Sequence, residues 1–135
     1  MVRTEITYQG QKRCEVLHEP SATKMETDAP KDNQGLGASF SPTDLVGVAL
    51  GSCIVTTMAI VAERDGIDFS KARAVVDKVM TDKPSRRIQR LEVKIYLPQS
   101  IPPEQRNKLE HISKACPVHR SLHPDLEIPV QFIYE

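Results

Sequence analysis

The stretch SPTDLVGVALGSCIVTTMAIVAER, residues 41–64, decides the fold. Its first residues are typical of a helix start, because serine caps a helix N-terminus, proline suits the first helical position, and Asp44 can close a capping box with Ser41. No charged side chain occurs between Leu45 and Ala62. We therefore expect one long helix, from about residue 42 to Arg64, that is buried on most of its sides.

Segments with alternating apolar residues or flanking turns predict strands on both sides of this helix. The expected order is three strands (2–9, 13–19 and 22–28), the long helix, two paired strands (70–81 and 87–97), a second helix (about 102–115), a short helical turn that begins at Cys116-Pro117, and a last strand (128–134). This order predicts an α+β fold, with a mostly antiparallel sheet covered by helices, in a single domain spanning residues 1–135.

The composition argues against several classes of partner. Lys plus Arg and Asp plus Glu both total 18, so no net charge draws the chain to nucleic acid or to an anionic membrane. Tryptophan is absent and aromatic residues make up 4%, so a base-stacking surface is not expected. The start, MVRTEITYQG, has no apolar segment typical of a secretory signal, and three cysteines then favour a reducing compartment. We expect a cytoplasmic protein with no nucleic-acid or membrane partner.

The long helix poses a packing problem, because it has almost no face suited to water. A chain of this length with one thin sheet cannot cover the helix on every side. Gly47 and Gly51, about one turn apart, would let a second helix approach closely. We therefore expect a homodimer in which two such helices pack together.

The cysteines occupy different settings. Cys53 lies in the middle of the helix, where a thiol often only fills space and gains nothing from the helix dipole. If Cys53 reacts, a cation from elsewhere must stabilise its thiolate. Cys116 precedes Pro117 and should cap a helical turn, where backbone N–H groups lower a thiol pKa and leave the sulfur reachable. Cys14, beside Arg13, is given no role.

The segment Cys116-Pro-Val-His119-Arg-Ser-Leu-His123 also has a spacing seen in metal sites. His119 and His123 could share a helical face with Cys116, and Cys53 or His111 could supply a further ligand. A metal site at these residues is an alternative to thiol chemistry. The preferred interpretation needs no metal and no cofactor.

Two motifs together resemble the OsmC/Ohr family of osmotically inducible and organic-hydroperoxide-resistance proteins. They are SPTDLVGVALGSC and, after a later helix, ACPVHRSL. The resemblance covers nearly the whole chain, including the order of strands and helices. It implies an intertwined OsmC-like homodimer with two long central helices, and reduction of organic or inorganic hydroperoxides by a cysteine thiol. It also implies an external dithiol as reductant.

The resemblance assigns roles to individual residues. Cys53 matches the peroxidatic cysteine, which becomes a sulfenic acid, and Cys116 matches the resolving cysteine. An arginine in the early strands of better-studied members activates the thiol, and Arg13 is its best match, with Arg3 as the fallback.

The chain departs from the family pattern at Thr43, where better-known members carry a glutamate that pairs with the arginine. Asp44, one position later, is expected to serve the capping box instead. The arginine–carboxylate pair is therefore expected to be absent, which favours the broad OsmC-like branch over Ohr. The alternative function is a non-catalytic OsmC-like dimer that binds a small ligand.

Overall fold

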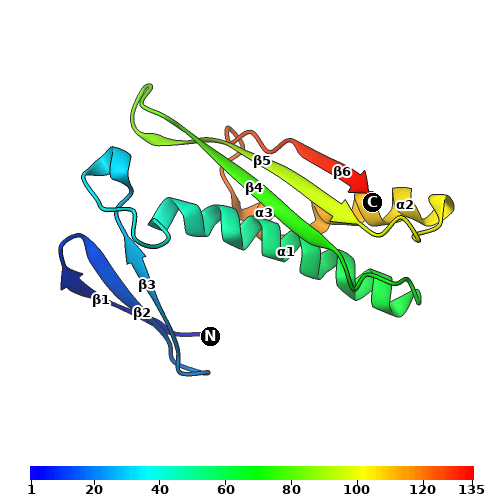
Figure 1. Ribbon diagram of the computed structural model, residues 1–135, viewed down its shortest axis with the longest axis horizontal. Coiled ribbons are helices and arrows are strands. Elements are labelled where there is room, and N and C mark those ends of the chain that lie inside the picture. The colour runs from blue at the N-terminus through cyan, green and yellow to red at the C-terminus, as the bar shows by residue number, and fades with distance from the viewer. The chain divides into compact units, whose positions relative to one another are not determined.

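The computed structural model describes all 135 residues, Met1–Glu135, and has the α+β architecture expected from the sequence (Figure 1). Its elements are β1 (Thr4–Gly10), β2 (Arg13–His18), β3 (Thr23–Asp28), the 3-10 helix η1 (Lys31–Asn33), α1 (Pro42–Arg64), β4 (Arg73–Thr81), β5 (Arg87–Leu97), α2 (Pro103–Ile112), the 3-10 helix η2 (Ser113–Ala115), α3 (Pro117–Ser121) and β6 (Val130–Tyr134). The chain divides into two compact units, Met1–Val46 and Gly47–Glu135. The single domain expected for residues 1–135 stays a prediction.

The N-terminal unit is built on a three-stranded antiparallel sheet in the order β1–β2–β3. After η1 the chain returns to β3, where the backbone N–H of Asp28 donates to the carbonyl of Phe40 at 3.0 Å. An isolated bridge between Thr27 and Phe40 adds to this contact. The returning segment therefore lies along the end of β3 and covers Asp28.

The capping box expected at the start of α1 is present. The backbone N–H of Ser41 donates to Oδ2 of Asp44 at 2.8 Å, and the backbone N–H of Asp44 donates to Oγ of Ser41 at 3.1 Å. These two bonds satisfy backbone donors that the first turn of a helix leaves without partners. The helix begins at Pro42 and ends at Arg64, as the sequence predicted.

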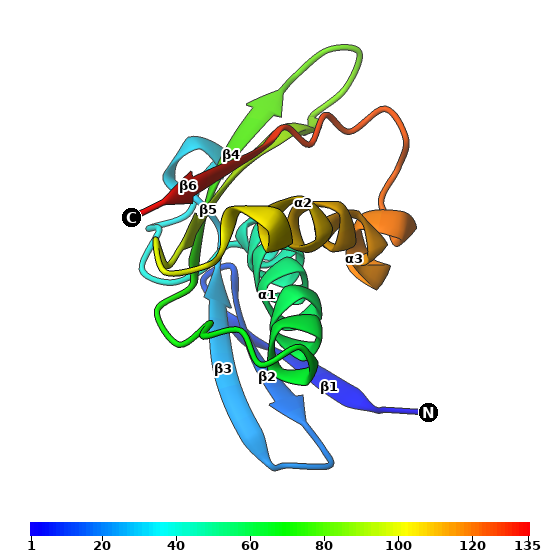
Figure 2. The ribbon, with the colours of Figure 1, turned by 90° about the vertical axis from the view of Figure 1, so that its right-hand side faces the viewer.

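The C-terminal unit is built on a second three-stranded sheet, in the order β4–β5–β6. Strands β4 and β5 are antiparallel, whereas β6 is parallel to β5. A strand that returns through a crossover of helices arrives parallel, and here α2, η2 and α3 form that crossover. The sheets are thus mostly antiparallel, as expected, but the chain forms two of them and its last strand is parallel. Figure 2 shows α1 and α2 on the same side of the β4–β5–β6 sheet.

The buried face of α1 follows the helical period. Its members are Gly47, Leu50, Gly51, Ile54, Met58, Val61 and Ala62. In β5 the alternate residues Leu91, Val93, Ile95 and Leu97 are also buried. Burying one such large apolar side chain contributes about 1.5–3 kcal/mol, so this contact between helix and sheet is the main core of the unit.

Gly47 and Gly51 have a different role from the one expected. A Cβ atom added at Gly51 would lie 2.9 Å from Cγ2 of Val76, and one added at Gly47 would lie 3.4 Å from Cγ1 of the same residue. The expectation that these glycines admit the helix of a second copy is therefore wrong. Both glycines instead face β4 of their own chain, and the missing side chain of Gly51 lets α1 lie close to Val76.

The face of α1 opposite these glycines is exposed and has no charge over three turns. Val48 is 48% exposed and Ile60 is 64% exposed, and the exposed residues Ser52 and Thr56 lie between them at helical spacing. We call Val48, Ser52, Thr56 and Ile60 the outer face of α1. Uncharged, partly apolar faces of this kind are typical of contacts with another protein surface.

Judged by length and composition alone, α1 is the one helix of the structure that could cross a membrane. Its mean hydropathy is 2.2. Core helices of soluble proteins meet the same criteria. The close approach of Gly51 to Val76 is the packing of a core helix on a sheet. The absence of a membrane partner and the cytoplasmic location stay predictions.

We expect Gly51→Ala to lower the free energy of unfolding by about 1–2 kcal/mol. The overpacking against the β-branched Val76 should outweigh the roughly 1 kcal/mol that alanine gains over glycine in a helix. The matched control is Gly47→Ala. A methyl group fits at this position, so the substitution should raise the free energy of unfolding by up to about 1 kcal/mol. Urea denaturation measures both, and equal effects of the two substitutions would contradict this packing.

Candidate functional site

The structure brings Cys53 and Cys116 together. Cys53 lies in the middle of α1 and is half-buried, whereas Cys116 immediately precedes α3 and is 0% exposed. Their thiols lie close enough for each to shift the pKa of the other, although most of the second unit separates them along the chain. Both belong to the unit Gly47–Glu135.

Cys116 is the N-cap of α3, as its position before Pro117 predicted. Its sulfur accepts a hydrogen bond from the backbone N–H of His119 at 3.4 Å. Proline at the first helical position fixes the backbone for a helix start, and the cap residue Cys116 has a non-helical backbone with φ -55° and ψ 122°. This local geometry holds the Cys116 sulfur and the first N–H groups of α3 at the Cys53 thiol.

Burial raises the pKa of Cys53, but three hydrogen bonds outweigh burial and leave this pKa below its ordinary value. The donors, in order of effect, are the thiol of Cys116, the backbone N–H of Val118 and the side chain of Thr57. Hydrogen bonds to the ionised form of a group favour that form. Groups within the same unit therefore stabilise the thiolate of Cys53. The expectation that a cation must stabilise this thiolate is wrong, because hydrogen bonds lower its pKa.

The pKa of Cys116 is raised, first by burial and next by its hydrogen bond to Cys53. The N–H groups of His119 and Val118 lower this pKa but do not compensate. The expectation that Cys116 is reachable and has a lowered pKa is therefore wrong. A cap position supplies N–H groups, but it does not keep the sulfur in water, and here the loss of hydration dominates.

These two thiols form an asymmetric pair. Cys53 is the more acidic and the more exposed of the two, which makes it the better nucleophile. Cys116 is the less acidic thiol, and its proximity to Cys53 raises its pKa further. An oxidised sulfur on Cys53 would have a second thiol already in contact, which is the arrangement needed to form an intramolecular disulfide.

Arg13 lies in the N-terminal unit and has a carboxylate partner. Its Nε atom is 3.8 Å from Oδ1 of Asp28, whose side chain is 1% exposed. Arg13 of β2 and Asp28 of β3 are cross-strand partners in register, and Oδ2 of Asp28 accepts a hydrogen bond from the backbone N–H of Ala38 at 2.9 Å. Arg13 therefore has a carboxylate partner in Asp28 that the sequence analysis did not predict, and the expected absence of the family's pair through position 43 stays a prediction.

The other sequence candidates have structural partners. Arg3 is 70% exposed and lies 4.0 Å from Glu19 in a surface ion pair. The hydroxyl of Thr43 is 3.1 Å from that of Ser41, and Asp44 belongs to the capping box. A role for Arg13, Arg3, Thr43 or Asp44 at the thiols stays a prediction.

The metal-site alternative gains no support from the geometry. No group of three or more His, Cys, Asp and Glu side chains is placed to hold a metal ion. His123 is 73% exposed, and its Nδ1 accepts a hydrogen bond from the backbone N–H of Asp125 at 3.1 Å. It therefore does not join Cys116 and His119.

We expect iodoacetamide to alkylate Cys53 much faster than Cys116 at neutral pH. The lowered pKa of Cys53 increases its thiolate fraction, and Cys116 is buried. In Cys116→Ala the loss of the thiol donor raises the pKa of Cys53. The increase of the Cys53 alkylation rate with pH should therefore occur at a higher pH than in the parent. Peptide mass spectrometry across a pH series measures both rates. Faster labelling of Cys116, or an unchanged profile in Cys116→Ala, would contradict the asymmetry.

Comparison with known proteins identifies the family and the fold of the chain. The family model of OsmC-like protein matches residues 33–131. The chain is 37% identical to a solved Psychrobacter arcticus protein, a candidate osmotic stress induced and detoxification response protein, with a TM-score of 0.91 over 98% of this chain and 96% of that one. No curated protein matches the chain.

More distant solved structures share the fold. An OsmC-like protein from Mycoplasma pneumoniae is 15% identical, with a TM-score of 0.83 over 100% of this chain and 98% of that one. An organic hydroperoxide resistance protein OsmC from Legionella pneumophila is 13% identical, with a TM-score of 0.76 over 98% and 96% of the two chains. At these identities the likeness is one of fold.

Proposed function

This chain belongs to the OsmC-like protein family, and from that premise we propose that it is a thiol peroxidase for organic or inorganic hydroperoxides. Cys53 is the peroxidatic residue in this proposal, and Cys116 is the resolving residue. The supporting observation is the asymmetric thiol pair, in which a more acidic cysteine contacts a buried, less acidic one. The hydroperoxide resistance named for the Legionella pneumophila structure agrees with this chemistry.

In the first step the Cys53 thiolate attacks one oxygen of the hydroperoxide. The O–O bond breaks, a sulfenic acid forms on Cys53, and the leaving oxygen takes a proton from water and departs as an alcohol, or as water when the substrate is hydrogen peroxide. The donors from Thr57 and the backbone of Val118 hold the thiolate in place before the attack.

In the second step the sulfur of Cys116 attacks the sulfur of the Cys53 sulfenic acid. The S–O bond breaks, a disulfide forms, and the hydroxide released combines with the proton of Cys116 to give water. An external dithiol then reduces the disulfide by two thiol–disulfide exchanges and is itself oxidised to a disulfide. The cycle needs no metal or organic cofactor.

Arg13 has a supporting role in the proposed cycle. Its guanidinium is paired with Asp28, and in the proposed cycle it approaches Cys53 and favours the thiolate form of that residue. Arg3, whose side chain is mostly in solvent, is the weaker candidate for this role.

The proposed enzyme is a homodimer. The outer face of α1 (Val48, Ser52, Thr56 and Ile60) is exposed on one chain and uncharged, and packing against a second copy would remove it from water. Light scattering should give a molar mass in solution of twice the 15.1 kDa of one chain.

One experiment tests the proposed function directly. The reduced protein is treated with one equivalent of tert-butyl hydroperoxide or hydrogen peroxide, and its peptides are examined by mass spectrometry. The expected product is a disulfide between Cys53 and Cys116, with Cys14 still reduced. The alternative of a non-catalytic dimer that binds a small ligand predicts no such bond, and its absence after oxidation would reject the proposed cycle.

A further inference from the structure

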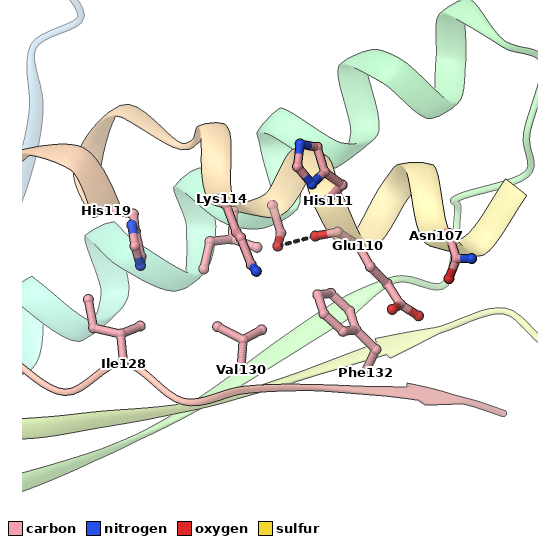
Figure 3. A pocket seen from close by; sticks show the side chains of 10 residues that line it. Asn107, Glu110, His111, Lys114, His119, Ile128, Val130 and Phe132 are labelled. Atoms are coloured by element: carbon pink, nitrogen blue, oxygen red, sulfur yellow. Dashed lines mark hydrogen bonds between the residues drawn. The ribbon is translucent and has the colours of Figure 1, made fainter.

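A second site lies beside the thiol pair, in a cavity of about 700 Å³ within the C-terminal unit. Its lining comes from α1, α2, η2, α3, β6 and the chain leading into β6. It consists of Ile54, Asn107, Glu110, His111, Ser113, Lys114, His119, Ile128, Val130 and Phe132 (Figure 3). Neither Cys53 nor Cys116 belongs to this lining. The volume is within the range of cavities that hold small organic ligands.

The cavity has an apolar side. Ile128, Val130 and Phe132 alternate along the last strand and its approach, so all three face the helices (Figure 3). Ile54 of α1 is 0% exposed and adds a fourth apolar side chain. This side suits a short alkyl or aromatic group.

The opposite side has a basic end and an acidic end. Figure 3 shows the side chains of Lys114 and His119 directed toward Ile128 and Val130, whereas Glu110 is directed toward Phe132 and Asn107 lies beyond it. The ring of His111 points away from the strand.

Lys114 does not neutralise Glu110, although four residues separate them. Oε1 of Glu110 accepts a hydrogen bond from the hydroxyl of Tyr134 at 2.8 Å, and the 3-10 turn η2 interrupts the regular helix before Lys114. Burial and this hydrogen bond raise the pKa of Tyr134, which therefore remains the donor to the carboxylate. The ammonium group of Lys114 stays available at the basic end of the cavity.

We propose that this cavity binds an organic carboxylate with a short apolar body. The carboxylate accepts hydrogen bonds from the ammonium of Lys114 and the ring of His119, and the body lies on Ile128, Val130 and Phe132. Hydrogen bonds between ionised partners are the stronger ones, so the basic end sets the orientation of the ligand. This site goes beyond the proposed peroxidase cycle and requires neither thiol.

The test uses octanoate as the probe, with octanamide as its uncharged counterpart and acetate as the counterpart without an apolar body. Titration of the full chain is followed by calorimetry and by backbone amide NMR shifts. Octanoate should bind with shifts centred on residues 113–119 and 128–132, and at least tenfold more tightly than octanamide or acetate. Equal binding of octanamide, shifts on another surface, or no binding at millimolar octanoate would overturn the proposal.

Two variants with opposite expected effects sharpen the test. Lys114→Gln removes the cation and should weaken octanoate binding about tenfold. Glu110→Gln removes a negative charge that repels the carboxylate of octanoate, and should strengthen binding about two- to threefold. Lys71→Gln, an exposed lysine outside the cavity, is the matched control and should change nothing. Binding should also persist in Cys53→Ser, so a failure at this site and a failure of the peroxidase cycle are distinguishable.

Discussion

Cys53→Ser is expected to consume tert-butyl hydroperoxide no faster than the buffer does, with dithiothreitol present as reductant. A serine hydroxyl does not ionise near neutral pH, so the three hydrogen bonds that stabilise the Cys53 thiolate have no anion to act on. This is the largest effect we expect of any single substitution. Peroxide remaining over time is the measurement, made on protein with a circular dichroism spectrum unchanged from the parent.

Cys116→Ser should behave differently, because it removes the second step and keeps the first. One equivalent of peroxide should be consumed rapidly, after which Cys53 stays a sulfenic acid or is oxidised further to a sulfinic acid, which mass spectrometry detects. Cys14→Ser is the matched control and should turn over like the parent. Full turnover in both Cys53→Ser and Cys116→Ser would exclude the thiol pair from the chemistry.

The second large effect concerns Arg13. Arg13→Ala should lower the free energy of unfolding by about 1–3 kcal/mol, because the buried carboxylate of Asp28 then keeps only the N–H of Ala38 as a partner. Arg13→Ala combined with Asp28→Asn should recover part of this loss, since the uncompensated buried charge is then gone. Chemical denaturation of the parent, both single variants and the double variant gives the coupling between the two side chains.

Arg3→Ala is the control for Arg13, because the Arg3–Glu19 pair is exposed and such pairs contribute at most about 1 kcal/mol. Peroxide consumption separates a structural role of Arg13 from a chemical one. If Arg13 activates Cys53, the double variant should remain slow although its stability is partly restored. Recovery of both quantities together would assign Arg13 to stability alone.

Features that depend on neighbouring residues were predictable from the sequence. The long helix begins and ends where expected, because Ser41, Pro42 and Asp44 define its start locally. The direction of β6 was not predictable in this way, since strand pairing depends on where a crossover returns the chain. The partners of Gly47 and Gly51 were misjudged for the same reason. A glycine in a helix indicates close packing against another element, but it does not tell whether that element is a strand or a second helix.

Much of the candidate site depends on contacts between distant segments. The approach of Cys116 to Cys53 was expected from the family resemblance and not from spacing. Thr57 follows Cys53 by four residues, and helical spacing alone could have indicated its contact. Likewise, pairing the predicted strands 13–19 and 22–28 in register would have placed Asp28 opposite Arg13. The burial of Cys116 had no local signal.

That burial has a consequence for regeneration in the proposed cycle. Once a disulfide joins the two cysteines, an incoming thiol can approach only the sulfur of Cys53, so the mixed disulfide with the reductant forms on α1 and Cys116 is always the leaving group. The second thiol of the dithiol then completes the exchange at Cys53, so a donor protein whose second cysteine is replaced should stay covalently joined to Cys53 and can be recovered with this protein.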